Sequence, residues 1–250
     1  MAMSIIALTA GIISGIMGLL MLLIGLKLYN LYQKNPKKEG LYLCLSIFSF
    51  IITTWSATIV YLSAGSSLIV AQIFQKSIYT FVFIGIMLTF LFASKIFFTP
   101  KKELFVAYIV LGIACILILV AFPTSEVDNF PDSADYPLLL LKLEYGILLV
   151  LYILPTAFGI FWIGMKVSKK VDDPISKTSF RYISTAQLMI PLTFTFDTIA
   201  SLFMNNIYVY SIFLYLTWVP PVVAAYLYDR GYTLPERARK RQSSNKGEED

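Results

Sequence analysis

Residues 4–26 read SIIALTAGIISGIMGLLMLLIGL and contain no charged side chain. A helix needs about 20 mostly apolar residues to cross the hydrocarbon core of a bilayer, and this stretch is long enough. No Lys or Arg precedes it, and the residues that follow, Lys27-Leu28-Tyr29-Asn30, form no small-residue cleavage pattern. The sequence therefore predicts a retained membrane-spanning helix and not a cleaved signal peptide.

Similar apolar stretches recur along the whole chain. Of its residues, 58% are hydrophobic and only 14% are charged, and the mean hydropathy is +0.74, whereas a soluble domain has about 25% charged residues. This composition predicts an all-α, multi-pass protein of the cell membrane that leaves almost no soluble domain. We expect seven spans, at about 4–29, 41–63, 69–98, 105–122, 138–166, 182–205 and 207–228.

The positive charges alternate between the two sides of these predicted spans. Every Lys and Arg except Lys76 and Lys142 lies in four segments that follow the odd-numbered spans: 27–38, 95–102, 166–181 and 230–246. The opposite loops contain no Lys or Arg, and the longest of them carries acidic side chains at Glu126, Asp128, Asp132 and Asp135. The positive-inside rule therefore predicts an outside N-terminus and a cytoplasmic C-terminus.

The absence of histidine excludes many kinds of catalytic and metal site. Without imidazole there is no His-ligated zinc or haem, no Ser-His-Asp or Cys-His catalysis and no phospho-accepting histidine. Cys44 and Cys115 both fall in apolar runs, so they are interpreted as packing residues. The seventh span has no lysine for a retinal Schiff base. We therefore expect no enzyme, no metal and no cofactor.

Four charged residues fall inside predicted spans, in the half nearer the outside. They are Lys76, Lys142, Glu144 and Asp197, and charges at such depth are candidates for functional sites because burying them is costly. On the third span, Gln72, Gln75, Lys76 and Tyr79 share one helix face by their spacing, and Trp55 lies at a similar depth on the second span. These eight residues form the predicted ligand-binding site, in a cavity that opens outward with Lys76 and Asp197 on its wall.

A structural alternative remains open for these charges. The lysines could pair with the acids merely to hold helices together, or Lys142 and Glu144 could extend to the outer interface. Prolines inside the last three spans predict helix kinks, at Pro155, Pro191, Pro220 and Pro221. We expect such kinks to suit a bundle that flexes, although a static bend fits them as well.

Three segments together resemble the seven-helix N-terminal sensor region of certain archaeal and bacterial histidine kinases. They are LYLCLSIFSFIITTWSATIVYLS (41–63), QKSIYTFVFIGIMLTFLFASKIFF (75–98) and the exit from the last span, AAYLYDRGYTLPERARK (224–240). The resemblance implies an input module. The chain departs from the family because it has no His and no glycine-rich nucleotide box, so any signal would leave through another polypeptide.

The tail, residues 229–250, is basic near the membrane and acidic at its end, and it is too polar to fold alone. We predict that it is disordered and that its cluster of cations contacts anionic lipid or a protein partner: Arg237, Arg239, Lys240 and Arg241. The 169–181 loop is a second predicted partner contact. We expect the bilayer and a cytoplasmic protein as partners, with a second copy of the chain as a further candidate and no nucleic acid.

The leading functional hypothesis is a non-enzymatic membrane sensor or receptor-like protein that signals through a separate cytoplasmic partner. Its mechanism would be a population shift between two packings of the bundle. Two alternatives stay open at this point. One is a non-catalytic subunit of a larger membrane complex for secretion, DNA transfer or respiration, and the other is a small channel or carrier.

Overall fold

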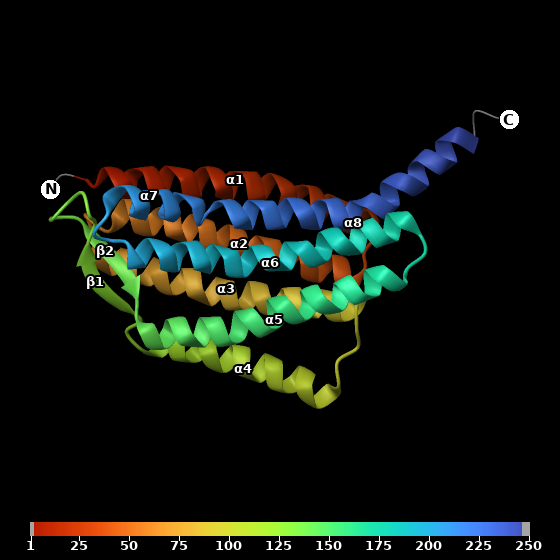
Figure 1. Ribbon diagram of the computed structural model, residues 1–250, viewed down its shortest axis with the longest axis horizontal. Helices are drawn as coiled ribbons and strands as arrows, with labels where there is room; N and C mark the ends of the chain where they lie inside the picture. Colours follow the sequence, from red (N-terminus) through yellow and green to blue (C-terminus); the bar gives the residue numbers. More distant parts are fainter. Residues whose placement is uncertain (1–2, 247–250) are drawn as a thin grey trace.

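The computed structural model describes the backbone of residues 3–246 and the side chains of residues 3–234. Long helices run side by side along one axis, and a β-hairpin covers one end of them (Figure 1). In the described chain the helices are α1 (Ile5–Lys34), α2 (Lys38–Ser63), α3 (Leu68–Ile96), α4 (Lys102–Ala121), α5 (Leu143–Lys170), α6 (Pro174–Leu202), α7 (Ile207–Leu216) and α8 (Val219–Lys246). We call the two ends of the bundle the hairpin end and the basic end.

The helices pack in chain order and close into a ring. Each of α1 to α5 contacts the next helix, α6 packs on both α7 and α8, and these two return to α1. α3 also contacts α5, which leaves α4 at the outside of the bundle. Only 17% of the apolar stretch within α4 is buried. This helix therefore presents most of its surface to its surroundings.

Within residues 3–246, six helical segments are long and apolar enough to cross a membrane, which confirms the prediction of a membrane protein. They are α1 to α5 and the continuous stretch Ile207–Leu234, which joins α7 to the first part of α8. α6 is as long as the others and packs between α5 and α8. Its sequence is rich in Ser and Thr and includes Lys177, Arg181 and Asp197, so composition alone does not make it a seventh span.

A β-hairpin interrupts the otherwise helical fold between α4 and α5. Strands β1 (Ser125–Asn129) and β2 (Pro137–Leu141) pair in antiparallel register, with Val127 opposite Leu139. The predicted fifth span, which began at residue 138, is therefore wrong at its start. A short run of leucines fits the beginning of a buried helix and a strand equally well, and here the run pairs with the charged strand before it.

The predicted loop over 169–181 is also mostly helical. Only residues 171–173 separate α5 from α6, because Asp173 caps the N-terminus of α6 and Pro174 occupies its first position. The Asp173 carboxylate accepts hydrogen bonds from the backbone N–H groups of Ile175 (3.3 Å) and Ser176 (2.8 Å). These are the groups that a helix start leaves without partners.

The last span is two helices, not one kinked helix. α7 ends at Leu216 and α8 begins at Val219, so Pro220 and Pro221 lie in the first turn of α8. First-turn N–H groups have no partner within a helix, which makes proline compatible with this position. The prediction of kinks at Pro220 and Pro221 is corrected to a helix break at Thr217 and Trp218. Pro155 and Pro191 do lie inside α5 and α6.

α8 does not stop where the apolar sequence stops. It continues to Lys246, so the predicted disorder is wrong for residues 229–246. Between residues 235 and 246 the chain has Glu236, Ala238 and five Lys or Arg residues, and all of these residue types favour helix. The side chains of Arg237, Arg239, Lys240 and Arg241 lie outside the described part of the structure.

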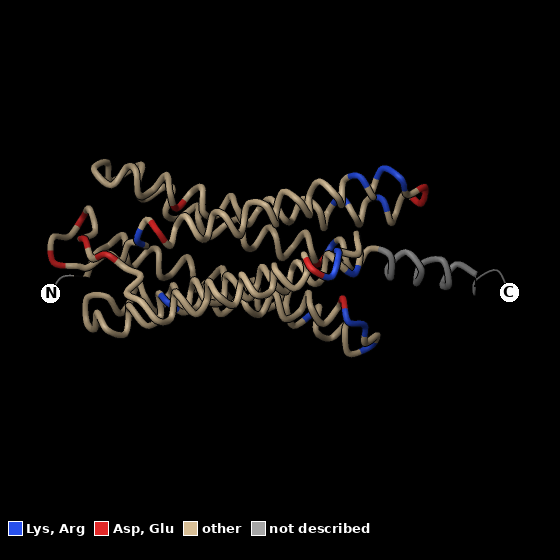
Figure 2. The backbone as a smooth tube through the Cα atoms, turned by 90° about the horizontal axis from the view of Figure 1, so that it is seen from below, with Lys and Arg blue, Asp and Glu red and all other residues tan. Residues whose placement is uncertain are grey.

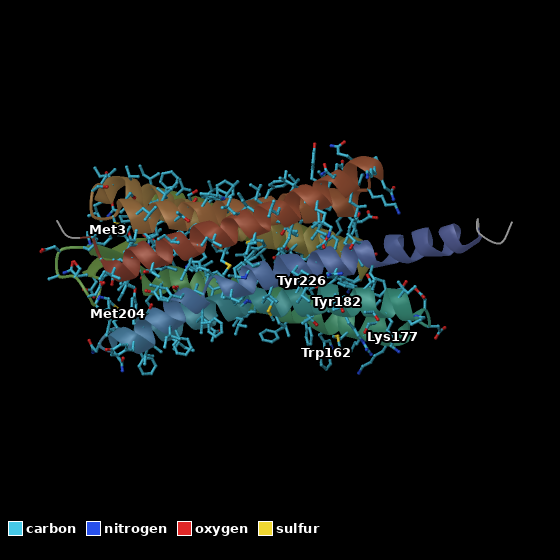
Figure 3. All side chains as sticks on the ribbon, turned by 90° about the horizontal axis from the view of Figure 1, so that it is seen from above. Met3, Trp162, Lys177, Tyr182, Met204 and Tyr226 are labelled. Carbon is cyan, nitrogen blue, oxygen red and sulfur yellow. The ribbon has the colours of Figure 1, made fainter. Side chains whose placement is uncertain are left out.

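Charge divides the two ends of the molecule. Lys and Arg gather at the basic end, and acidic residues lie along the hairpin (Figure 2). Trp162, Tyr182 and Tyr226 lie toward the basic end, near Lys177 (Figure 3), and their side chains are all exposed. The Trp162 ring faces Lys166, with Nζ 5.2 Å from the ring centroid. Exposed Trp and Tyr next to cations are typical of a membrane–water interface.

Candidate functional site

The predicted ligand-binding residues do not meet in one place. The Nζ of Lys76 donates to the carbonyl of Val120 at 2.9 Å, in the last turn of α4. This contact satisfies a helix-end carbonyl. Trp55 is 38% exposed, and its ring edge lies close to Gly18 of α1. Lys76 and Trp55 therefore contact α4 and α1, respectively, and not each other.

Lys142 and Glu144 lie at the very start of α5 because β2 occupies the residues before them. Lys142 is half-buried at the position before the helix, and Glu144 is exposed in its first turn. Among residues 3–234, the one ion pair joins Lys27 to Asp229. The alternative that Lys76 or Lys142 pairs with Asp197 or Glu144 is therefore not what the structure shows.

Part of the predicted site does come together around Asp197. Its carboxylate interacts electrostatically with Tyr79 of α3, Tyr61 of α2 and Tyr210 of α7. Gln75, one helical turn from Tyr79, donates through Nε2 to the carbonyl of Leu139 in β2 at 3.0 Å. Gln72 is half-buried on the same helix. The sequence did not identify Tyr61 and Tyr210, because they are aromatic residues in apolar spans.

The hairpin is fixed to the bundle by hydrogen bonds at its turn. Asp132 accepts from the hydroxyl of Ser4 at 2.6 Å and from the backbone N–H of Ile6 at 3.1 Å, at the start of α1. The hydroxyl of Tyr136 donates to the carbonyl of Tyr61 at 2.6 Å. Burial raises the pKa of Tyr136, which keeps this hydroxyl a neutral donor. These contacts hold the hairpin against the ends of α1 and α2.

An open hollow of about 620 Å³ lies beside the hairpin. Met204, at the end of the bundle that the hairpin covers (Figure 3), is on its wall. The hollow is large enough for a small ligand and is lined by Asp128, Asn129, Pro131, Met204, Asn205 and Ile207. Neither Lys76 nor Asp197 lines it, so the expected wall of the outward cavity is not found here.

A chain of aromatic rings leads from this hollow into the bundle. Phe130 lies between two hollow-lining residues and packs on Tyr136, Tyr61 and Tyr210, with ring centroids 5.9, 6.5 and 6.4 Å apart. The Tyr61 ring then meets the ring of Trp218 edge-on, at 6.1 Å. Edge-to-face rings at such distances attract one another. The hairpin is thus in continuous contact with the break between α7 and α8.

Comparison of the chain with family models, curated proteins and solved structures found no match. Within the described residues, no group of three His, Cys, Asp or Glu side chains could hold a metal ion.

The break itself lacks two backbone donors. Pro220 and Pro221 have no N–H, so neither can donate to the carbonyl four residues earlier, at Leu216 and Thr217. Trp218 occupies the break and is 6% exposed. Interrupted helices with unpaired carbonyls inside a membrane bundle occur where the backbone is buried in protein or lines a cavity. The break is therefore a local weakness in the segment that leads to α8.

Toward the basic end, buried polar contacts fix α8 to its neighbours. Gln187 of α6 donates to the hydroxyl of Tyr228, and Ser179 donates to the carbonyl of Gly231. Lys27 of α1 pairs with Asp229. Sequence reasoning missed these pairs because the two partners of each are distant along the chain.

Proposed function

We propose that this protein is a non-enzymatic sensor or receptor-like protein of the cell membrane. It crosses the bilayer seven times, with α6 as one crossing and α7 with α8 as another, and its hairpin end faces outward. The cations at the opposite end support this orientation. The exposed Trp162, Tyr182 and Tyr226 support an interface at that same end.

The observation that carries the proposal is the ring contact from the hairpin to the helix break. A ligand in the hollow would touch Asn129 and Pro131, on either side of Phe130, and Ile207, the first residue of α7. Phe130 contacts Tyr210 of α7 and Tyr61, and Tyr61 contacts Trp218. A ligand that favours one hairpin position would therefore favour one arrangement of the break.

The output is the position of α8 at the basic end. α8 extends from the break past the ends of the other helices (Figure 1), so a small change at Trp218 is magnified along it. A ligand shifts such an equilibrium only by its difference in affinity for the two arrangements. A separate cytoplasmic protein reads the position of α8, because the chain has no histidine for kinase chemistry of its own.

Spin-label distances test whether the hairpin controls α8. In a Cys44→Ala/Cys115→Ala background, labels at residues 33 and 230 report the distance between the basic ends of α1 and α8. We expect Phe130→Ala to shift or broaden this distance distribution. Val127→Ala is the matched control, because Val127 lies on the same hairpin, is 52% exposed and is not one of the aromatic residues of this path.

A second label pair separates transmission from general loosening. Residues 33 and 45 lie on α1 and α2, outside the α7–α8 path, and their distance should stay unchanged in Phe130→Ala. If Phe130→Ala leaves the 33–230 distance as it is in the parent protein, or changes both pairs equally, the hairpin does not control α8. Either result contradicts the sensor proposal.

The partner is tested by co-purification in mild detergent. The full chain should retain a stoichiometric cytoplasmic protein, and a chain that ends at residue 234 should lose it while keeping the thermal stability of the bundle. Retention of the same protein by the shortened chain would show that α8 beyond the bundle is not the signalling contact.

One observation favours a second candidate function, a structural subunit of a larger membrane complex. The buried residues of α4 are only Gly112, Cys115 and Leu119, and the rest of this apolar helix is open to lipid or to another protein. Co-purification distinguishes the two proposals as well. A structural subunit would co-purify with several membrane proteins that contact α4, and this association would not depend on residues 235–250.

A further inference from the structure

The exposed face of α5 changes character in three steps as the helix approaches the basic end. Phe158, Trp162 and Lys166 are spaced by four residues, so they lie on one face of the helix. All three are exposed. The ammonium of Lys166 lies over the Trp162 ring, with Nζ 5.2 Å from the ring centroid. An apolar ring, an amphipathic ring and a cation thus follow one another, in the order of hydrocarbon, interface and headgroup.

α8 repeats this order with other residues. Val223, Tyr226 and Arg230 follow one another by three and four positions, and all three are exposed. The guanidinium carbon of Arg230 lies 5.0 Å from the centroid of the Tyr226 ring, and Nε donates to the Tyr226 hydroxyl at 2.9 Å. A cation over an aromatic face is attracted to it, so the ring holds the Arg230 side chain in a defined position.

α6 lies between these two helices, because it packs on both α5 and α8. It contributes an exposed Arg181 and an exposed Tyr182. The three aromatic residues of the three helices lie at a similar level along the bundle (Figure 3). We call the following set the α5–α6–α8 face: Trp162, Lys166, Arg181, Tyr182, Tyr226 and Arg230.

The cations of the α5–α6–α8 face have no carboxylate partner in the described part of the chain. Among residues 3–234, neither Lys166 nor the two arginines take part in an ion pair. Asp229, which precedes Arg230, pairs with Lys27 instead, and Asp173 caps the start of α6. The aromatic rings position two of the cations but do not neutralise them. The face therefore presents uncompensated positive charge to whatever covers it.

We propose that the α5–α6–α8 face binds anionic phospholipids in preference to zwitterionic ones. Their phosphate groups contact Lys166, Arg181 and Arg230, and a guanidinium matches a phosphate with two parallel hydrogen bonds. Their acyl chains lie along Phe158 and Val223, which precede the rings. Charge complementarity selects the anionic headgroup, and the apolar residues select a lipid over a soluble anion. This contact is separate from the one expected of the tail.

Brominated lipids test this face through Trp162, because bromine on an acyl chain quenches the fluorescence of a nearby tryptophan. A Trp55→Phe variant is placed in vesicles of equal parts phosphatidylglycerol and phosphatidylcholine, in which only one of the two lipids carries bromine. Subtraction of the signal of a Trp55→Phe/Trp162→Phe variant isolates Trp162. We expect phosphatidylglycerol to be enriched next to Trp162 by about fivefold, because one cation near an anionic surface gains about this factor.

Variants that change one cation test the location. Lys166→Gln should make the two brominated lipids quench Trp162 more nearly equally, and Lys166→Arg should keep the difference. Lys38→Gln is the matched control, because it removes one exposed cation from the same end of the molecule. Lys38 is the first residue of α2, which packs on α1 and α3. We expect Lys38→Gln to leave the preference at Trp162 unchanged.

A second reporter repeats the test on α8. Tyr226→Trp, in the Trp55→Phe/Trp162→Phe background, keeps an aromatic ring for Arg230 and places the fluorophore on that helix. Brominated phosphatidylglycerol should again quench it more strongly than brominated phosphatidylcholine. Arg230→Gln should reduce this difference. The two reporters depend on different substitutions, so poor folding of one variant does not remove the test.

Three results would overturn the proposal. Equal quenching by the two lipids at both reporters would mean that the face does not distinguish headgroups. An equal effect of Lys38→Gln and Lys166→Gln would mean that only the total charge of the basic end matters. No quenching by either lipid would mean that protein, such as a second copy of the chain, covers the face. The lipid preference does not depend on the hairpin, so the spin-label distances test the sensor proposal separately.

Discussion

Asp229 is the most deeply buried carboxylate of the structure among residues 3–234, and its partner is not equally buried. The Asp229 side chain is 5% exposed and that of Lys27 is 47% exposed. One oxygen of Asp229, Oδ1, is buried without a hydrogen-bond partner. The ammonium of Lys27 is therefore the main compensation for a charge that is costly to bury.

Removal of Lys27 alone should be the most damaging change at this pair. We expect Lys27→Met to lower the stability of the bundle by about 2–4 kcal/mol, because an uncompensated carboxylate stays buried. The double variant Lys27→Met/Asp229→Asn should recover part of this loss, and thermal unfolding in mild detergent measures both. Strictly additive losses would show that the two groups do not depend on each other.

At the scale of the helix, the start of α6 depends on one exposed carboxylate. The side chain and backbone N–H of Ser176 hydrogen-bond Asp173 and lower the pKa of its carboxyl below the usual range. A lowered pKa in the folded state means that the ionised cap stabilises the fold above the ordinary Asp pKa of about 3.9. This stabilisation is lost as the pH falls through the lowered value.

We therefore expect Asp173→Ala to lower the unfolding temperature at pH 7, and the difference from the parent protein to shrink as the pH falls below about 4. Thermal unfolding at a series of pH values checks this prediction. Asp172→Ala is the control, because Asp172 makes no capping contact in the described structure. A difference between Asp173→Ala and the parent that stays constant with pH would mean that ionisation of the cap contributes nothing.

Hydropathy predicted most of the helices, but it missed the hairpin and several helix ends. The apolar runs gave the positions of most helices, since twenty apolar residues have few alternatives to a spanning helix. The hairpin was missed because Leu138–Leu141 is apolar on both strand faces and lacks alternation. The ends of α6 and α8 were misplaced because caps and helix propensity, not hydropathy, decide where polar helices begin and end.

At the same scale, the site was less predictable than the fold. Charge and depth selected Asp197 and Tyr79, which interact electrostatically in the structure, but they also selected Lys76, which binds a helix end, and Trp55, whose ring edge lies against Gly18 of α1. Contacts such as Lys27–Asp229 join residues 202 positions apart. One sequence carries no signal for such a pairing, because each partner alone looks like an ordinary residue at the end of a span.

For the molecule as a whole, the orientation proposed above makes a direct prediction. A cysteine at residue 129 on the hairpin, in a Cys44→Ala/Cys115→Ala background, should react with a membrane-impermeant maleimide in intact cells. A cysteine at residue 170 should react only after the cells are opened. Both positions are exposed, so accessibility and not burial decides the result. The reverse pattern would invert the proposed orientation.

The hydrogen bond between Ser4 and Asp132 joins two residues that are synthesised at different times. Ser4 leaves the ribosome first, and Asp132 follows 128 residues later, after four helices have been synthesised. During that interval the first turn of α1 lacks the contacts that later hold it. α7 and α8, which pack on α1 and complete the ring, are made later still. Until they are synthesised, the surface of α1 that they cover in the finished bundle has no partner within the chain.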